Sequence, residues 1–182
     1  MKKIQMVDLK GQYEGIKDEV NASMQEILES TAFINGPQVH DFQKELQEYL
    51  GVKHVIPCAN GTDALQIAMM GLGLKPGDEV ITADFTFAAT VEVIALLQLT
   101  PVLVDVYPDT FNIDVEAIER AITPKTKAIV PVHLFGNVVD IEKLRKIVGS
   151  DIFIVEDCAQ AHGASIRGSK AGSLGNISAF SF

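Results

Sequence analysis

Residues 79–106, EVITADFTFAATVEVIALLQLTPVLVDV, contain a β-branched run, a helical pattern and a second β-branched run. Glu79–Ala83 and Pro101–Val106 are predicted strands, and Thr86–Leu97 between them is a predicted helix. Strands that are joined through a helix run parallel in one sheet, because a parallel pair needs a long crossover connection. This stretch therefore predicts a parallel α/β fold.

The same alternation occurs on both sides of this stretch. Further strands are predicted at His54–Cys58, Ala128–Val132 and Ile152–Glu156, with further helices at Asp63–Leu72, Val115–Ala121 and Ile141–Val148. Residues 176–182, NISAFSF, read as another strand. Repeated units of this kind imply a mostly parallel sheet with helices on both faces. Ligands bind to such sheets at the carboxyl ends of the strands.

Residues 1–50 are predicted to form an N-terminal helical segment. Pro37 suits a first helical turn and Gly51 suits a helix stop. The apolar residues of this second helix fall on one face: Val39, Phe42, Leu46, Tyr49 and Leu50. An earlier amphipathic helix contains Ile16, Val20, Met24, Ile27 and Leu28. We expect the two helices to pack across the sheet domain or against a partner subunit.

Composition narrows the class of protein. The 182 residues include 15 Lys and Arg against 24 Asp and Glu, a net charge of −9. This balance argues against nucleic-acid binding, which needs clustered cations. Residues 1–20, MKKIQMVDLKGQYEGIKDEV, contain no apolar stretch, so neither a signal peptide nor a membrane anchor is expected there. No later segment is long and apolar enough to span a bilayer.

The cysteines and histidines show no spacing that is typical of a metal site. Cys58 and Cys158 cannot form a disulfide framework and are interpreted as buried structural thiols in a reducing cytoplasm. The four histidines are scattered, so no metal site is expected. Dinucleotide-binding, P-loop and nucleophile-elbow motifs are also absent from the sequence.

Two loops follow predicted strands and could contact a ligand. In ANGTDAL, residues 59–65, N–H groups at a helix start and a threonine hydroxyl could bind a phosphate. Thr62 or Asp63 could equally serve only as a helix cap. In DFTFAAT, residues 84–90, Phe87 could stack on a flat cofactor ring or belong to the core.

The third loop, IVEDCAQAHG at residues 154–163, is the most informative. Asp157 at the end of an apolar strand could keep a pyridine nitrogen protonated. Glu156 should point to the opposite face as a solvated or capping charge. Gln160 could donate to a ring oxygen, and His162 is interpreted as a hydrogen-bonded structural histidine.

The segments ANGTDAL, DFTFAAT, PVHLFG, VEDCAQAHG and AFSF occur in this order. From Val7 to Phe182 the chain resembles the DegT/StrS (DegT/DnrJ) family of nucleotide-sugar aminotransferases, which use pyridoxal 5′-phosphate (PLP). The resemblance implies an α/β fold, the large domain of the aspartate aminotransferase-like PLP fold-type I. Residues 51–182 would be an incomplete PLP-binding large domain that stops before a small C-terminal domain.

The resemblance also implies roles for individual residues. Gly61, Thr62 and Ser181 would contact the phosphate, and Phe87 would stack on the pyridine ring. Asp157 would be the partner of the pyridine nitrogen, and Gln160 would be the partner of the ring hydroxyl. The Schiff-base lysine of the family would follow Phe182, and Lys170 is interpreted as a solvated loop charge. On this basis the 182-residue chain alone is expected to be inactive.

The family likeness implies a reaction as well. The complete enzyme would transfer an amino group, from glutamate, to a keto group of a nucleotide-linked sugar. A UDP-linked 3-keto-N-acetylhexosamine or its uronate is the expected substrate, in surface-polysaccharide or lipopolysaccharide sugar synthesis. A cytoplasmic homodimer is expected. The alternatives are a PLP-dependent nucleotide-sugar dehydratase, with histidine in place of the lysine, and a catalytically inactive fragment.

Overall fold

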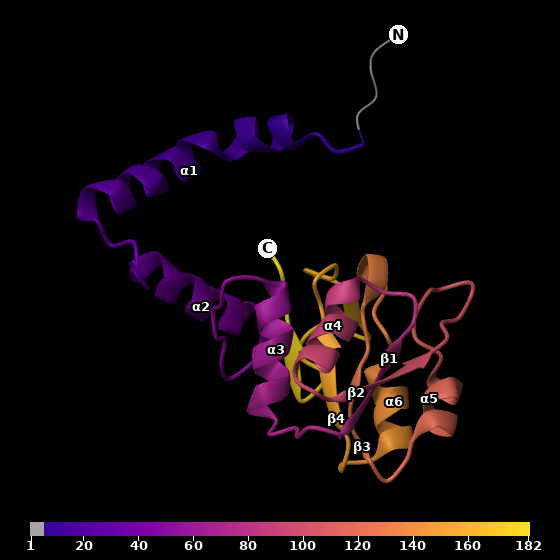
Figure 1. Ribbon diagram of the computed structural model, residues 1–182. Helices are drawn as coiled ribbons and strands as arrows, with labels where there is room; N and C mark the ends of the chain where they lie inside the picture. The colour runs from indigo at the N-terminus through magenta and orange to yellow at the C-terminus, as the bar shows by residue number, and fades with distance from the viewer. Residues whose placement is uncertain (1–5) are drawn as a thin grey trace. The chain divides into compact units, whose positions relative to one another are not determined.

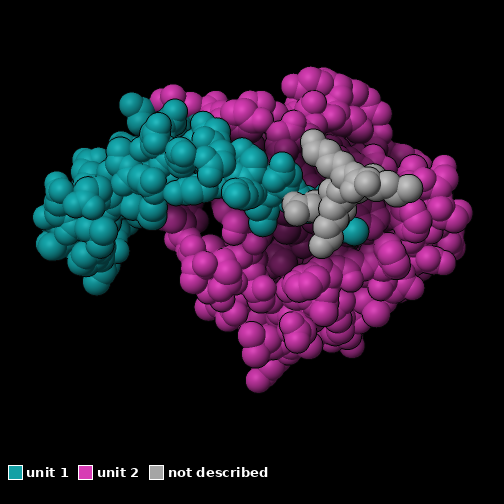
Figure 2. Space-filling model, turned by 90° about the horizontal axis from the view of Figure 1, so that it is seen from above, with its two compact units in different colours: residues 1–46 teal, residues 47–182 magenta. Residues whose placement is uncertain are grey.

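The computed structural model describes residues 6–182 (Figure 1). Residues 1–5, with the two lysines considered in the signal-peptide prediction, lie outside the described residues. The chain divides into two compact units, residues 1–46 and residues 47–182 (Figure 2). None of the helices that the structure describes combines the length and apolar character needed to cross a membrane.

The two helices predicted near the N-terminus are confirmed. Helix α1 spans Leu9–Ser30 and begins after Asp8, whose carboxylate accepts the Gly11 N–H at 2.9 Å. Helix α2 spans Pro37–Leu50 and begins with the expected proline. Gly51 follows it with a φ of +70°, a left-handed conformation that favours glycine. Helix α1 buries no side chain, and its packing across the sheet domain or against a partner subunit stays a prediction.

The second unit contains a five-stranded parallel sheet, as the alternation predicts. Its strands, in the spatial order β2-β1-β3-β4-β7, are Thr100–Val104, Glu79–Ala83, Thr126–Val130, Phe153–Asp157 and Ile177–Ala179. The helices between them are α3 (Gly61–Gly71), α4 (Ala88–Leu96), α5 (Val115–Ala121) and α6 (Ile141–Val148). Smaller elements are the 3₁₀ turn η1 (Leu134–Gly136) and the hairpin β5 (Ser165–Ile166) with β6 (Ser169–Lys170).

The helices cover both faces of the sheet because neighbouring strand residues point in opposite directions. Val80 packs in the apolar cluster of α3 and α4, together with Met69 and Ile94. Its neighbour Ile81 packs in the cluster of α5 and α6, together with Leu144. The two-sided α/β architecture expected from the sequence is therefore confirmed.

One predicted strand is wrong. The described backbone has no strand between Gly51 and Glu79, so His54–Cys58 lies in irregular chain. Pro57 in this run has no N–H to donate, which makes it unsuited to a central parallel strand. Cys58 is consequently exposed, which corrects the prediction of a buried thiol, whereas Cys158 is buried as predicted. The final strand is also shorter than NISAFSF suggests, because β7 ends at Ala179.

Ile129, at the centre of the sheet, is fully buried. We expect Ile129→Ala to lower the free energy of unfolding by about 2–5 kcal/mol, because it leaves a cavity in a packed core. Leu96→Ala on α4 is the matched control, since the Leu96 side chain is 67% exposed. Urea denaturation of the two variants measures the difference. Equal losses would contradict the assignment of the core.

Candidate functional site

Asp157 is the last residue of β4 and lies at the carboxyl end of the sheet. Its side chain is buried, with Oδ2 accepting the Thr90 hydroxyl at 2.9 Å and Oδ1 accepting the Ala159 N–H at 3.1 Å. Burial raises the pKa of Asp157 from its ordinary value, and the two hydrogen bonds oppose that rise only in part. A buried carboxylate with only a few partners attracts a cationic N–H group, which is the chemistry expected for holding a protonated pyridine nitrogen.

Gly61 and Ser181 are far apart in the sequence but meet at the start of α3. A Cβ atom at Gly61 would lie 2.6 Å from the Ser181 Cβ and 2.9 Å from its Oγ, so the close approach requires glycine. Asn60 caps the helix, its side-chain oxygen accepting the Asp63 N–H at 2.9 Å. The alternative that Thr62 or Asp63 is the cap is therefore wrong. Thr62 is exposed in the first turn, where N–H groups favour an anion.

Gln160 is oriented by the turn that follows β3. Its Oε1 accepts the Phe135 N–H at 2.7 Å, so the amide nitrogen is directed elsewhere as a donor. Phe135 has a φ of +57°, an uncommon conformation for an aromatic residue. This contact is consistent with the role of donor that the sequence suggests for Gln160.

Phe87 is 71% exposed and directly precedes α4, which excludes the interpretation as a core residue. It lies three residues before Thr90, the partner of Asp157. The neighbouring Thr86 hydroxyl is buried and has no hydrogen-bond partner within the described residues.

His162 is hydrogen-bonded, as predicted, with its Nε2 2.7 Å from the Ser181 carbonyl oxygen.

Glu156 differs most from its prediction. It is fully buried rather than solvated or capping. Its carboxylate accepts N–H groups from Gly172 at 3.0 Å, Leu174 at 2.8 Å and Gly175 at 2.6 Å. The sequence did not reveal these partners because backbone N–H groups have no side-chain signature. The one usable signal was a carboxylate inside an apolar strand followed by the glycine-rich run AGSLG at residues 171–175.

His133 supplies a fourth hydrogen bond to Glu156, at 2.9 Å between Nε2 and Oε2. Its Nδ1 accepts the Val139 N–H at 3.1 Å, so the ring proton lies on Nε2 and is donated to the carboxylate. Burial alone would raise the pKa of Glu156, but His133 and the backbone donors outweigh burial and lower it. The pair is therefore a neutral imidazole and an ionised carboxylate.

Cys158 lies close to this pair, and the three ligand atoms are within 4.8 Å of one another. The residue types could bind a metal ion, but both ring nitrogens of His133 and both oxygens of Glu156 are already engaged by protein groups. Burial also raises the pKa of the Cys158 thiol, which keeps it protonated. The arrangement is that of a structural hydrogen-bond cluster.

Lys170 is not a solvated loop charge. Its ammonium group lies 3.3 Å from the centre of the Tyr49 ring and donates to the Tyr49 backbone oxygen. This cation–π contact joins β6 to the end of α2. The sequence could not predict the pairing, because 121 residues separate the two positions.

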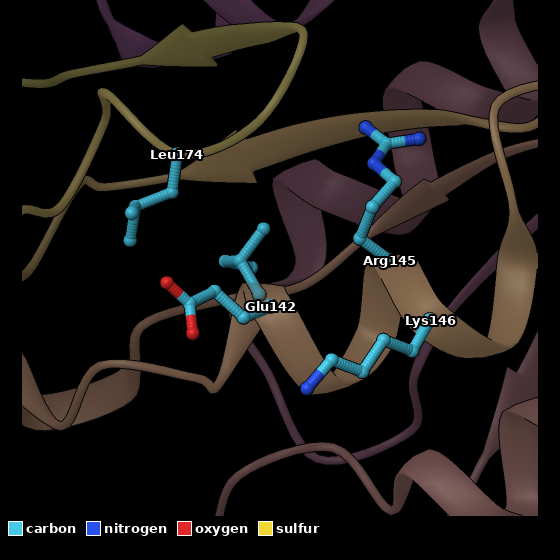
Figure 3. Close-up of a pocket in the computed structure, with 5 residues that line it drawn as sticks. Glu142, Arg145, Lys146 and Leu174 are labelled. Atoms are coloured by element: carbon cyan, nitrogen blue, oxygen red, sulfur yellow. The ribbon is translucent and has the colours of Figure 1, made fainter.

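A separate hollow of about 310 Å³ lies along α6 (Figure 3). It is lined by Ile141, Glu142, Arg145, Lys146 and Leu174. Arg145 donates to the Ile152 carbonyl oxygen at 2.9 Å and to the Asn176 side chain. Asn176 also accepts the Ile154 N–H at 2.9 Å, so Arg145 supports the segments that lead into β4 and β7.

Comparison with known proteins gives consistent results. The family model described as the DegT/DnrJ/EryC1/StrS aminotransferase family matches residues 14–182. UDP-2-acetamido-2-deoxy-3-oxo-D-glucuronate aminotransferase of Pseudomonas aeruginosa is 46% identical over 98% of this chain and 50% of its own length. UDP-N-acetyl-3-dehydro-alpha-D-glucosamine 3-aminotransferase of Acidithiobacillus ferrooxidans is 43% identical over 98% and 49%. The chain spans about half the length of the curated relatives it matches.

Two solved structures show the same fold. The crystal structure of S. venezuelae DesV in complex with a ketimine intermediate has a TM-score of 0.96 and 38% identity, covering 100% of this chain and 49% of that one. E coli GDP-4-keto-6-deoxy-D-mannose-3-dehydratase with bound hydrated PLP has a TM-score of 0.81 and 30% identity, covering 85% and 42%. These matches agree with the predicted fold of the large domain in PLP fold-type I enzymes.

The raised pKa of Asp157 gives a prediction about stability. An acidic group whose pKa is raised on folding is harder to ionise in the folded state than in the unfolded state. The loss of folding stability that its ionisation causes therefore grows as the pH rises above the ordinary pKa of 3.8. We expect Asp157→Asn to have a higher free energy of unfolding than the unchanged protein at pH 7. This gain should shrink as the pH falls towards and below 3.8, because the carboxyl group is then protonated in the folded state and increasingly protonated in the unfolded state.

Urea denaturation at pH 7 and pH 4 measures this difference. Asp151→Asn, at an exposed position, is the control and should show no comparable gain. A less stable Asp157→Asn protein at pH 7 would contradict the expectation that burial dominates at this carboxylate.

Proposed function

Because the chain belongs to the DegT/DnrJ/EryC1/StrS aminotransferase family, we propose that the complete protein is a PLP-dependent enzyme that transfers an amino group to a keto sugar linked to a nucleotide. The observation that carries this proposal is the buried Asp157 carboxylate, held by two donors at the carboxyl end of β4. Relatives named as aminotransferases of keto sugars linked to UDP support the reaction class.

The residues present fit PLP. The N–H groups at the start of α3, with Gly61, Thr62 and Ser181, would hold the phosphate, which the close approach of Gly61 to Ser181 supports. The Asp157 carboxylate would accept a hydrogen bond from the protonated pyridine nitrogen, and the Gln160 amide would donate one to the ring hydroxyl. When bound, the cofactor supplies an electron-accepting pyridinium ring for chemistry at the substrate carbon.

Each of these residues has a definite task in the proposed enzyme. Thr90 and the Ala159 N–H fix the carboxylate of Asp157, so that it remains ionised opposite a positive partner. Phe87, which is exposed, would cover one face of the ring and exclude water from it. The buried Thr86 hydroxyl beside it could complete its hydrogen bonding with the cofactor.

The proposal has finer features that go beyond the reaction class. We propose a UDP-linked 3-keto-N-acetylhexosamine or its uronate as the substrate, glutamate as the donor, and a role in surface-polysaccharide sugar synthesis. The name of the P. aeruginosa relative supports the substrate. Residues 51–182 would be part of the large domain of a cytoplasmic homodimer. The Schiff-base lysine and the small domain would lie in sequence beyond residue 182.

A nucleotide-sugar dehydratase is the second candidate. The E coli dehydratase with bound hydrated PLP has the same fold and is 30% identical to this chain, which supports dehydration as the second candidate reaction. The two candidates differ in the residue that would follow β7 in the complete protein. A lysine there supports amino transfer, and a histidine supports dehydration.

An absorbance spectrum of the complete protein with PLP tests the proposal. We expect a visible band from the bound cofactor that disappears when glutamate is added, because an aminotransferase takes the amino group from its donor. A stable band that no amino donor changes would favour the dehydratase. No band, together with no retention of PLP on dialysis, would refute the proposed cofactor.

Gly61→Ala tests the phosphate contact. An added Cβ would lie 2.6 Å from the Ser181 Cβ, so we expect PLP affinity to fall about tenfold, the cost of losing one good hydrogen bond to a charged group. Gly71→Ala, in the same helix but with open space around the added Cβ, is the matched control. Equilibrium dialysis measures both affinities. Equal affinities for the two variants would place the phosphate elsewhere.

A further inference from the structure

Glu156 joins three parts of the chain that the sequence separates. Its Oε1 accepts N–H groups from Leu174 and Gly175, and its Oε2 accepts from Gly172 and His133. Both side chains of the Glu156–His133 pair are fully buried. The carboxylate therefore has no open face toward a substrate, and its contacts all serve to hold neighbouring backbone.

The turn at residues 172–175 leads directly into β7. Gly172 has a φ of +89°, and a Cβ there would overlap the Phe180 ring, so the turn packs closely on the residues that follow β7. The Ser178 hydroxyl donates to the Gly172 carbonyl oxygen at 2.9 Å. A Cβ at Gly175 would lie 2.8 Å from the Ile154 carbonyl oxygen, which shows how tightly the turn meets β4. The turn that Glu156 holds therefore acts together with the direct pairing of β7 with β4 to fix the position of β7.

The next residues carry this dependence to the candidate site. Ser181 follows Phe180 and approaches Gly61 at the start of α3. On the other side, His133 precedes η1, where the Phe135 N–H orients Gln160. The Glu156–His133 pair therefore lies between the two segments that present Ser181 and Gln160.

We propose that Glu156 and His133 are positioning residues that fix the 172–175 turn and so set Ser181 against Gly61 for binding of a phosphate group. The inference deepens the proposed function and rests on it for the identity of the phosphate ligand. Neither residue would touch the cofactor. The side chain of the adjacent Asp157 has its own donors in Thr90 and the Ala159 N–H, and the His133 backbone N–H donates to the Asp157 carbonyl oxygen whatever the side chain at position 133. Substituting the side chains of the pair should therefore affect the phosphate end of the site more than the Asp157 carboxylate.

Glu156→Gln is the first test variant. Its amide oxygen can still accept from Leu174 and Gly175, but its NH₂ group would face the His133 and Gly172 N–H donors. We expect affinity for PLP to fall about tenfold and affinity for pyridoxal, which lacks the phosphate, to change less than about twofold. Deuterium uptake of residues 171–182 should increase. Glu119→Gln, at an exposed position on α5, is the control for both measurements.

A pair of His133 variants separates positioning from general damage to the core. His133→Gln keeps a donor near Nε2 for Glu156, whereas His133→Asn keeps only an acceptor near Nδ1 for Val139. We expect the asparagine variant to lose PLP affinity selectively and to exchange faster over residues 171–182. The glutamine variant should remain close to the unchanged protein.

The outcomes are distinguishable. An unchanged ratio of PLP to pyridoxal affinity in folded Glu156→Gln would overturn the positioning role. If that variant does not fold, equal behaviour of the two His133 variants overturns it instead. If the unchanged protein binds neither PLP nor pyridoxal, the proposed function fails, and deuterium exchange over residues 171–182 alone decides whether the pair holds the turn.

Discussion

The structure depends on how two adjacent carboxylates are buried at the end of β4. Removing a charged carboxylate from water costs free energy unless hydrogen-bond donors replace the solvent. Alternation along the strand directs Glu156 and Asp157 into different surroundings, so each needs its own donors. Glu156 receives them from a glycine-containing turn and a histidine, and Asp157 from a threonine and one backbone N–H. The fold around β4 is organised to satisfy both groups.

The unequal supply of donors gives the two carboxylates opposite pKa shifts. Glu156 has four partners and a lowered pKa, so it is ionised and fully compensated within the protein. Asp157 has fewer donors and a raised pKa, so its charge is only partly compensated. A cationic ligand would supply the missing compensation, and the folded protein holds the carboxylate ready for it. On the proposed function, these two adjacent acidic residues would serve structure and cofactor binding separately.

The sequence predicted what depends on local pattern and missed what depends on distant backbone. Residues 115–121 and 141–148 show a clear helical pattern, and α5 and α6 have the predicted bounds. The run at His54–Cys58 was predicted as a strand from its apolar residues, but Pro57 lacks the N–H that a central strand needs, and the run is irregular in the structure. Asp157 was singled out by its place at a strand end, and its role stays a prediction. Glu156 was misjudged because three of its four partners are N–H groups of a turn 16 to 19 residues later.

The meeting of Gly61 and Ser181 links the beginning and the end of the sheet unit. The segment before Gly61 is irregular, and β7 before Ser181 is a three-residue strand that, among the strands the structure describes, pairs only with β4. The pairing with β4 and the turn bound to Glu156 together hold the segment that carries Ser181 close to the start of α3. A phosphate that contacts both segments binds only when they are together, and by linkage it must also stabilise that arrangement. On the proposed function, phosphate binding and the ordering of the residues that follow β7 would therefore be linked.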